Sequence, residues 1–154
     1  MIDTRFSTAL HIMAIVAINQ ERAKRTTSKS LASSLGANAS FVRKLLGPLV
    51  DAELLKVVIG GRGGMYLTRP SNSILISEIY KAAAPEKKIW ETRSNLPCVC
   101  LVSRNIVSLS DLLQDKAQRS MLASLSDLSL NCVVEKLKDF EEQSSSSSQQ
   151  LDRL

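Results

Sequence analysis

The run from Thr27 to Leu67 constrains the fold of this chain most, because it holds two short helix patterns, a tight turn and a glycine-rich hairpin in one stretch. Ser28 is predicted to cap a first helix, and Gly36 supplies the left-handed residue that ends it. Asn38 is predicted to cap the next helix. The apolar residues of the first helix share one face and are Leu31, Ala32 and Leu35. This order predicts a winged helix-turn-helix.

The second helix of this run has an apolar side and a basic side. Its inward side is expected to carry Phe41, Leu45 and Leu49. The outward side carries Ser40, Arg43, Lys44 and Gly47. Small residues allow a helix to approach the DNA major groove closely, and Arg and Lys bind guanine edges or phosphates. A solvated helix face is the alternative, but the preceding turn and the following hairpin favour DNA binding.

A proline and a cluster of glycines shape the rest of this stretch. Pro48 is expected to bend or loosen the second helix, since it cannot donate to the carbonyl of Lys44. Segments 54–59 and 65–67 are predicted strands, joined by the tip GGRGG at 60–64. Such a tip can place Arg62 in a minor groove. A phosphate-binding nucleotide loop is a weaker alternative, because no GK[ST] sequence follows.

The formal charge of +5 is concentrated in the same half of the chain. Residues 1–70 carry ten Lys or Arg against four Asp or Glu, a net of +6, whereas residues 71–154 carry ten against eleven, a net of −1. A polyanion partner, double-stranded DNA, is the physical inference, with ordinary solubility charge as the alternative. The predicted DNA-binding residues are Ser28, Asn38, Ser40, Arg43, Lys44 and Arg62.

The first predicted helix, residues 4–19, is apolar nearly all round and must be covered on more than one side. His11 lies in it and is expected to be a core or boundary imidazole rather than a metal ligand or catalytic base. The apolar run 9–18 is too short to span a bilayer, and Asp3 does not suit a signal peptide. We therefore expect a cytoplasmic protein with no membrane association. Three cysteines, an odd number, favour reduced thiols.

The segment after the wing is predicted to begin with a short helix from a Ser77 cap to Ala83. Residues 84–104 show no periodicity and are predicted to form a loop of a length that is commonly functional or disordered. Cys98 and Cys100 in this loop are the candidate sensor residues.

Two amphipathic helices are predicted to follow the loop. The first spans 105–121, and its stripe of Ile106, Leu109, Leu113 and Ala117 is the predicted dimer interface. The second is predicted to start at a Ser124 cap, with Asp127 in the capping-box position. Its apolar residues are Leu130, Val133, Val134, Leu137 and Phe140. An intramolecular helical cap is the alternative to a dimer.

These patterns divide the chain into four predicted parts. A winged helix-turn-helix domain covers 1–83, a sensor loop 84–104, dimerisation helices 105–142, and a disordered Ser-rich tail 143–154. The predicted fold class is mainly α with a small β-wing and long dimerisation helices.

Several segments together resemble the Rrf-two (Rrf2) family of bacterial winged-helix regulators. They are TRFSTALHI, SLASSLGANASFVRKLLGPLVDAELL, GGRGGMYLTRP, ISEIYKAA and NLPCVC with SRNI, in an order and spacing that cover about residues 2–140. The resemblance implies a homodimer joined by the long helix after the loop. It also implies a recognition helix at 38–46 and a wing at 60–64.

The chain departs from this family pattern at the wing and in its cysteines. Gly60 stands at the usual wing arginine, Arg62 at a variable position and Met65 at the last glycine. Cluster-binding members place three cysteines in the loop, whereas only Cys98 and Cys100 lie there and Cys132 is distant. Iron–sulfur clusters usually need four converging ligands. We therefore predict no iron–sulfur cluster and no other cofactor or metal site, with thiol chemistry or no sensing at these cysteines.

The sequence thus predicts a homodimeric transcription regulator, a repressor of stress or metabolic genes that binds a double-stranded DNA operator and responds to a small-molecule or redox effector. One alternative is a thiol-based or iron–sulfur redox sensor of the same fold. Another is a winged-helix protein-interaction module without DNA binding. An enzyme is disfavoured and no catalytic residues are predicted, because the sequence shows no carboxylate pair, Ser/His/Asp set or metal cluster.

Overall fold

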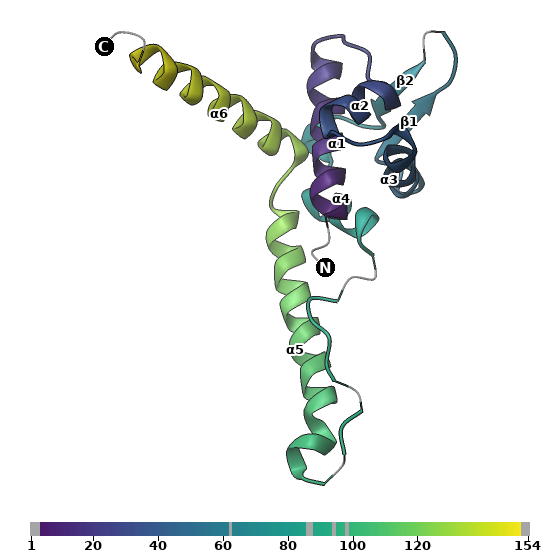
Figure 1. The fold of residues 1–154 in the computed structure, drawn as a ribbon, viewed down its shortest axis with the longest axis vertical. Coiled ribbons are helices and arrows are strands. Elements are labelled where there is room, and N and C mark those ends of the chain that lie inside the picture. The colour runs from purple at the N-terminus through teal and green to yellow at the C-terminus, as the bar shows by residue number, and fades with distance from the viewer. Residues whose placement is uncertain (1–3, 62, 86–87, 94, 98, 152–154) are drawn as a thin grey trace.

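The computed structural model describes residues 4–61, 63–85, 88–93, 95–97 and 99–151, with side chains as far as 144. Its elements are α1 (Arg5–Glu21), α2 (Ser28–Leu35), α3 (Ala39–Asp51), β1 (Leu55–Val58), β2 (Gly64–Leu67), a short 3-10 turn η1 (Ser71–Ser73), α4 (Ile76–Ala83), α5 (Leu101–Ser126) and α6 (Leu130–Leu151). The predicted fold class is confirmed: the chain is mainly helical, with a two-stranded antiparallel wing and long C-terminal helices (Figure 1). No helix in the described ranges has the length and apolar character that crossing a membrane requires.

Helix α1 forms the centre of the core. Ile12, Met13 and Val16 are fully buried, and α1 contacts α2, α3, α4, α6 and β2. The expectation that this helix is covered on more than one side is confirmed. His11, expected in the core or at its boundary, is instead exposed. At about 100° per residue it falls on the side of α1 away from the fully buried positions.

The two helices of the predicted helix-turn-helix form, with one change of cap. Thr27, not Ser28, caps α2: its Oγ1 accepts from the Ser30 N–H at 3.1 Å, and Ser30 Oγ accepts from the Thr27 N–H at 2.9 Å. This reciprocal pair satisfies two backbone donors, so Ser28 becomes the first helical residue. Gly36 ends α2 with φ +59°, and Asn38 Oδ1 accepts from the Phe41 N–H at 2.7 Å, as predicted.

The wing is a hairpin in which Leu55 pairs with Leu67 and Val58 with Gly64. Both predicted strands are confirmed with small shifts at their ends. The following helix, α4, does not start from a Ser77 cap. Glu78 Oε2 accepts from the Leu75 N–H at 2.8 Å, while Ser77 is buried and accepts a 2.8 Å bond from the Ser126 hydroxyl. Ser77 is the second residue of α4 and therefore lies inside the helix that it was predicted to cap.

The C-terminal helices are longer than predicted. Helix α5 starts at Leu101 and continues past Ser124, whose hydroxyl donates to the Ser120 carbonyl at 3.2 Å and therefore caps nothing. Ser129 takes that role for α6, since its Oγ accepts from the Cys132 N–H at 3.3 Å. The backbone of α6 stays helical to Leu151, so most of the predicted disordered tail is helical in this structure. Both helices extend away from the winged domain in different directions (Figure 1).

The root of α6 is fixed to the winged domain. Leu130 and Val134 are fully buried in the common core, and the Leu130 N–H donates to the Ile74 carbonyl at 2.8 Å. In return the Ile76 N–H donates to the Leu128 carbonyl at 2.9 Å. The long helices and the winged domain therefore share one core.

Candidate nucleic-acid interface

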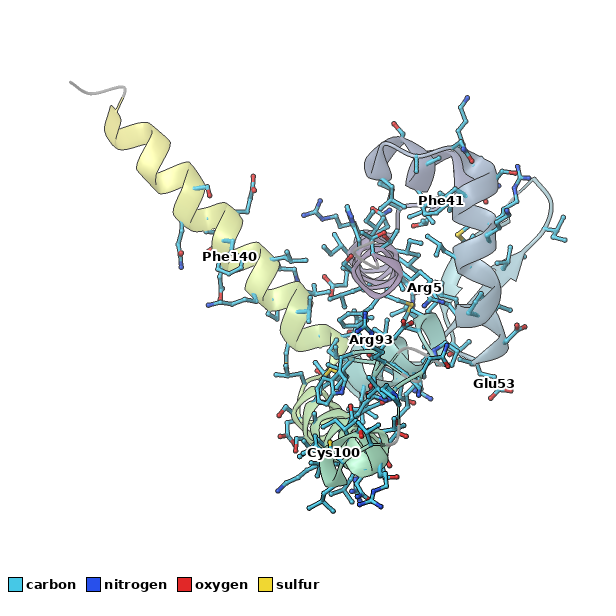
Figure 2. All side chains as sticks on the ribbon, turned by 60° about the horizontal axis from the view of Figure 1, so that its bottom comes forward. Arg5, Phe41, Glu53, Arg93, Cys100 and Phe140 are labelled. Atoms are coloured by element: carbon cyan, nitrogen blue, oxygen red, sulfur yellow. The ribbon has the colours of Figure 1, made fainter. Side chains whose placement is uncertain are left out.

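The outward face of α3 carries the side chains predicted to bind DNA. Ser40, Arg43, Lys44 and Gly47 are all exposed, and the buried side of the helix consists of Val42, Leu46 and Leu49. Phe41 and Leu45 are predicted on that buried side, but Phe41 is 42% exposed (Figure 2). Leu45 is only partly buried. A buried side that includes Leu49 can be completed either by residues 41 and 45 or by residues 42 and 46, because both pairs have the helical spacing i, i+4. Packing against the core selects the second.

Pro48 does not end α3. The helix continues to Asp51, and the Ala52 N–H donates to the Pro48 carbonyl at 3.1 Å. The recognition helix is therefore longer than the 38–46 that the family resemblance implies. Apart from its chain neighbours and its own helix backbone, a Cβ on Gly47 would meet no atom within 4 Å. The centre of the outward face is thus open and low, which suits close approach to a groove.

The charges on this face are available to a ligand. Arg43 and Lys44 are exposed and form no ion pair with any residue that the structure describes; the same holds for Lys56 on strand β1. Unpaired cations on one surface attract phosphates, because neutralising a phosphate releases its condensed counterions. Ser28 is half-buried at the start of α2, and the side-chain oxygen of Asn38 is occupied by its capping bond.

The wing lies beside the start of α2, and the contact that holds it was not predicted. Arg62 itself falls outside the described residues. The two residues before it in the chain are held by Arg25. Arg25 Nη1 donates to the Gly61 carbonyl at 2.9 Å, and Arg25 Nη2 donates to the Gly60 carbonyl at 3.4 Å. The sequence pattern predicts a charged loop at residues 21–25 but not this contact, because the contact joins residues 36 positions apart.

The candidate sensor residue that the structure describes, Cys100, lies far from this face (Figure 2). Cys98 is outside the described residues, and Cys100 lies at the end of α5 remote from the wing (Figure 2). Cys100 is exposed and caps α5. A hydrogen bond between its thiol and the Ser103 side chain, and a further one from the Ser103 backbone N–H, lower the pKa of the thiol. Cys132 is exposed at the start of α6, where the Ser129 side chain lowers its pKa in the same way. Within the described ranges no group of three His, Cys, Asp or Glu side chains converges.

The predicted dimer stripe is an exposed part of α5. Leu109 and Leu113 are 50% and 49% exposed, whereas Ile106 and Ala117 are half-buried. The segment before α5 covers the adjacent side of the helix: the Trp90 indole donates to Ser110 Oγ at 2.9 Å, and its backbone N–H to Gln114 Oε1 at 3.3 Å. Val102, which is exposed and which the prediction missed, continues the stripe by one turn, whereas the exposed Leu101 and Leu112 lie on the neighbouring side of α5.

Comparison with known proteins gives a consistent result. The model of a family described as "Rrf2: Iron-dependent Transcriptional regulator" matches residues 2–136. YwnA of Bacillus subtilis, which is named as an HTH-type transcriptional regulator, is 26% identical over 137 residues, covering 89% of this chain and 99% of YwnA.

Two solved structures share the fold. CymR, the global cysteine regulator of B. subtilis, aligns with a TM-score of 0.62 at 20% identity over 88% of this chain and 97% of its own. IscR of T. potens aligns with a TM-score of 0.64 at 20% identity over 93% of this chain and 90% of its own. At these identities the structural matches establish the arrangement of wing and long helices.

Proposed function

Because the chain belongs to the Rrf2 family of transcriptional regulators, we propose that it is a sequence-specific DNA-binding repressor that acts as a homodimer in the cytoplasm. The family contains regulators rather than enzymes. Its targets are proposed to be genes of a stress or metabolic response.

The outward face of α3 is the observation that carries this proposal. It combines an open centre at Gly47 with two exposed cations, Arg43 and Lys44, that form no ion pair within the described part of the chain, and the wing lies next to it. A helix of this kind fits a major groove, where its N-terminal residues reach base edges. A protein-interaction module would not need unpaired basic side chains on the same surface as an exposed wing. A protein-interaction module without DNA binding is therefore disfavoured.

A dimer is supported by the exposed leucines of α5. An apolar stripe on a helix that extends away from its own domain gains free energy when a second copy covers it. Two-fold proteins read half-sites about one helical turn apart, so a dimer also doubles the DNA contacts.

The test compares two double variants in salt titrations of binding to a duplex selected from a random pool by the wild-type protein. Arg43→Ala with Lys44→Ala should reduce affinity, and the slope of log K against log salt should decrease by about 1 for each phosphate that is no longer neutralised. Arg93→Ala with Arg104→Ala removes the same charge from exposed positions near α5 and should leave the slope unchanged. Equal slopes in both variants would reject this face as the DNA-binding surface.

We further propose that no iron–sulfur cluster is resident and that any effector acts on the thiols or through a small molecule. The family description names iron, but Cys100 and Cys132 start different helices and only Cys98 lies near Cys100 in the chain. A cluster usually needs four ligands in one volume. Iron and sulfide assays on protein purified without oxygen test this; near-stoichiometric iron with visible charge-transfer absorption would overturn it.

Thiol-based regulation is the second candidate function. Exposed cysteines with lowered pKa form thiolate more readily, and thiolate is the species that oxidants attack. Operator binding that is lost on oxidation and restored by a dithiol would support it, and Cys100→Ser should then remove the response.

A further inference from the structure

We propose that Arg25 is a wing-positioning residue: its guanidinium links the turn between α1 and α2 to the carbonyls at the wing tip and fixes the wing relative to the recognition helix. This inference rests on the proposed DNA-binding function. It assigns to Arg25 a role distinct from that of a phosphate contact, which is what an exposed cation in this domain would otherwise suggest.

The geometry uses a property that arginine has and lysine lacks. The two Nη groups of one planar guanidinium donate to two successive carbonyls, Gly61 at 2.9 Å and Gly60 at 3.4 Å. Gly60 adopts φ +113°, a conformation that side chains rarely allow. The tip is closed by the Gly63 N–H, which donates to the Gly60 carbonyl at 2.9 Å. Arg25 therefore bonds to the same short turn that closes the hairpin.

The segment carrying Arg25 is itself held firmly. The next residue, Thr26, is only 2% exposed, and its carbonyl accepts from the Met65 N–H of β2 at 2.9 Å. Its hydroxyl accepts from Asn19 Nδ2 at 2.9 Å. On the other side, Gln20 Oε1 accepts from the Leu67 N–H at 3.1 Å. Residues 19–26 thus lie along the edge of β2 that faces away from β1. They bond to the wing at three places: Leu67, Met65 and the tip at Gly60 and Gly61.

Close packing at Gly64 shows how tightly the two segments meet. A Cβ built there would lie 3.1 Å from the Thr26 carbonyl oxygen and 3.2 Å from Arg25 Cγ. The same segment leads directly into the Thr27 cap of α2. Thus one continuous strip of chain sets both the start of the helix-turn-helix and the position of the wing tip, and Arg25 makes the outermost contact.

A wing whose tip is already held in place should bind a DNA groove with a smaller loss of conformational entropy than a flexible wing. Ordering a flexible segment at the moment of binding costs free energy, and preorganised contacts avoid that cost. Removing Arg25 should therefore weaken binding to the selected operator duplex more than to an unrelated duplex. Removing a phosphate contact would instead weaken both equally and reduce the salt slope.

The experiment compares Arg25→Gln with Lys24→Gln, which removes the same charge one residue earlier. Lys24 is exposed, and its side chain bonds to no residue in the described part of the chain. In the free protein, hydrogen exchange of peptides covering 59–66 should become faster in Arg25→Gln only, with α1 and α3 unchanged. This readout does not depend on DNA binding, so it is separable from the proposed function.

Binding provides the second arm. Arg25→Gln should bind the selected duplex about three- to tenfold more weakly, the range expected when hydrogen bonds are removed, with an unchanged salt slope. A slope reduced by about 1 in Arg25→Gln, or equal wing exchange in both variants, would overturn the positioning role. If the wild-type protein binds no duplex, the proposed function fails while the exchange result still decides the role of Arg25.

Discussion

Gly47 has no side chain at an exposed, helical position in the middle of α3. Outside its chain neighbours and its own helix backbone, a Cβ there would meet nothing within 4 Å. The helix-propensity gain of alanine, about 0.5–1 kcal/mol, is opposed by the clash between the Pro48 ring and a Cβ on the preceding helical residue, so Gly47→Ala should not stabilise the fold. The same methyl group would stand on the face proposed to enter the groove. We therefore predict no gain of stability in urea unfolding together with weaker operator binding in a mobility-shift titration.

Gly36 is the matched control for this substitution. It also has open space around a built Cβ, but its φ of +59° is left-handed. Gly36→Ala should therefore destabilise the protein by about 1 kcal/mol, although it adds the same methyl group. Operator binding by Gly47→Ala at the wild-type affinity would contradict a groove contact at this position.

Cys100 allows a second prediction at the residue scale. Hydrogen bonds from Ser103 lower the pKa of its thiol, so its alkylation should reach half of its maximal rate at a lower pH than that of an unperturbed cysteine. Ser103→Ala should move this midpoint upward. Peptide-level mass spectrometry after iodoacetamide pulses measures it, and Cys132 is an internal control because its own partner is Ser129. An unchanged Cys100 midpoint in Ser103→Ala would count against this account.

At the scale of elements, the start of α4 depends on one carboxylate. Burial raises the pKa of Glu78, but hydrogen bonds from the Leu75 N–H and from Arg69, with the charge of Arg69, outweigh it and leave that pKa below its ordinary value. A folded-state pKa below the unfolded one gives stability that is present above the unfolded pKa. That stability is lost as the pH falls through the folded pKa.

Glu78→Ala should accordingly lower the free energy of unfolding by about 1 kcal/mol at neutral pH, as other cap removals do. The difference from wild type should shrink on acidification below about pH 4, where the carboxylate becomes protonated. Urea unfolding at pH 7 and at about pH 3.5 measures it. Glu91→Ala, at an exposed loop position, is the control; a similar pH dependence in both variants would refute the capping role.

Local chemistry explains which elements could be predicted from the sequence. Gly36 and Asn38 act within one turn of their own positions, so the boundaries between α2 and α3 follow from residue type. The cap of α2 was placed one residue late because Thr27 and Ser28 are both suitable and only Ser30 decides between them. Ser124 failed as a cap because nothing in the sequence signals that α5 continues past it.

The candidate interface was predictable to the same degree. Ser40, Arg43, Lys44 and Gly47 were assigned correctly to one exposed face, since a period of 3.6 residues fixes their common side. The sequence does not predict which residues of α3 form the buried side, because Phe41 and Val42 are both apolar and only packing against the core selects between them. Arg25 could not be identified, since its partners are backbone carbonyls 35 and 36 residues away.

At the scale of the whole molecule, α5 and α6 leave the winged domain with apolar side chains uncovered. On α5 these are Leu109, Leu112 and Leu113, and on α6 Phe140 is 53% exposed (Figure 2). The start of α6 is buried in the core, and the end of α5 is held against α4 by the Ser126–Ser77 hydrogen bond, so both helices are fixed to the winged domain. A second copy that covers α5 would therefore set the separation of the two recognition helices.

The dimer can be tested with two variants that each add one negative charge to α5, one inside the proposed interface and one outside it. Leu113→Glu puts a carboxylate into the proposed interface, where burial without a partner is strongly unfavourable, and should give a monomer with unchanged helical circular dichroism. Ser108→Glu adds the same charge at an exposed position outside the stripe and should remain dimeric. Sedimentation velocity at micromolar concentration distinguishes the two.

Because two linked half-sites bind far more tightly than one, Leu113→Glu should also lose most of its operator affinity while keeping its salt-dependent binding to DNA. A monomeric wild type, or a Leu113→Glu variant that stays dimeric, would show that α5 is not the interface.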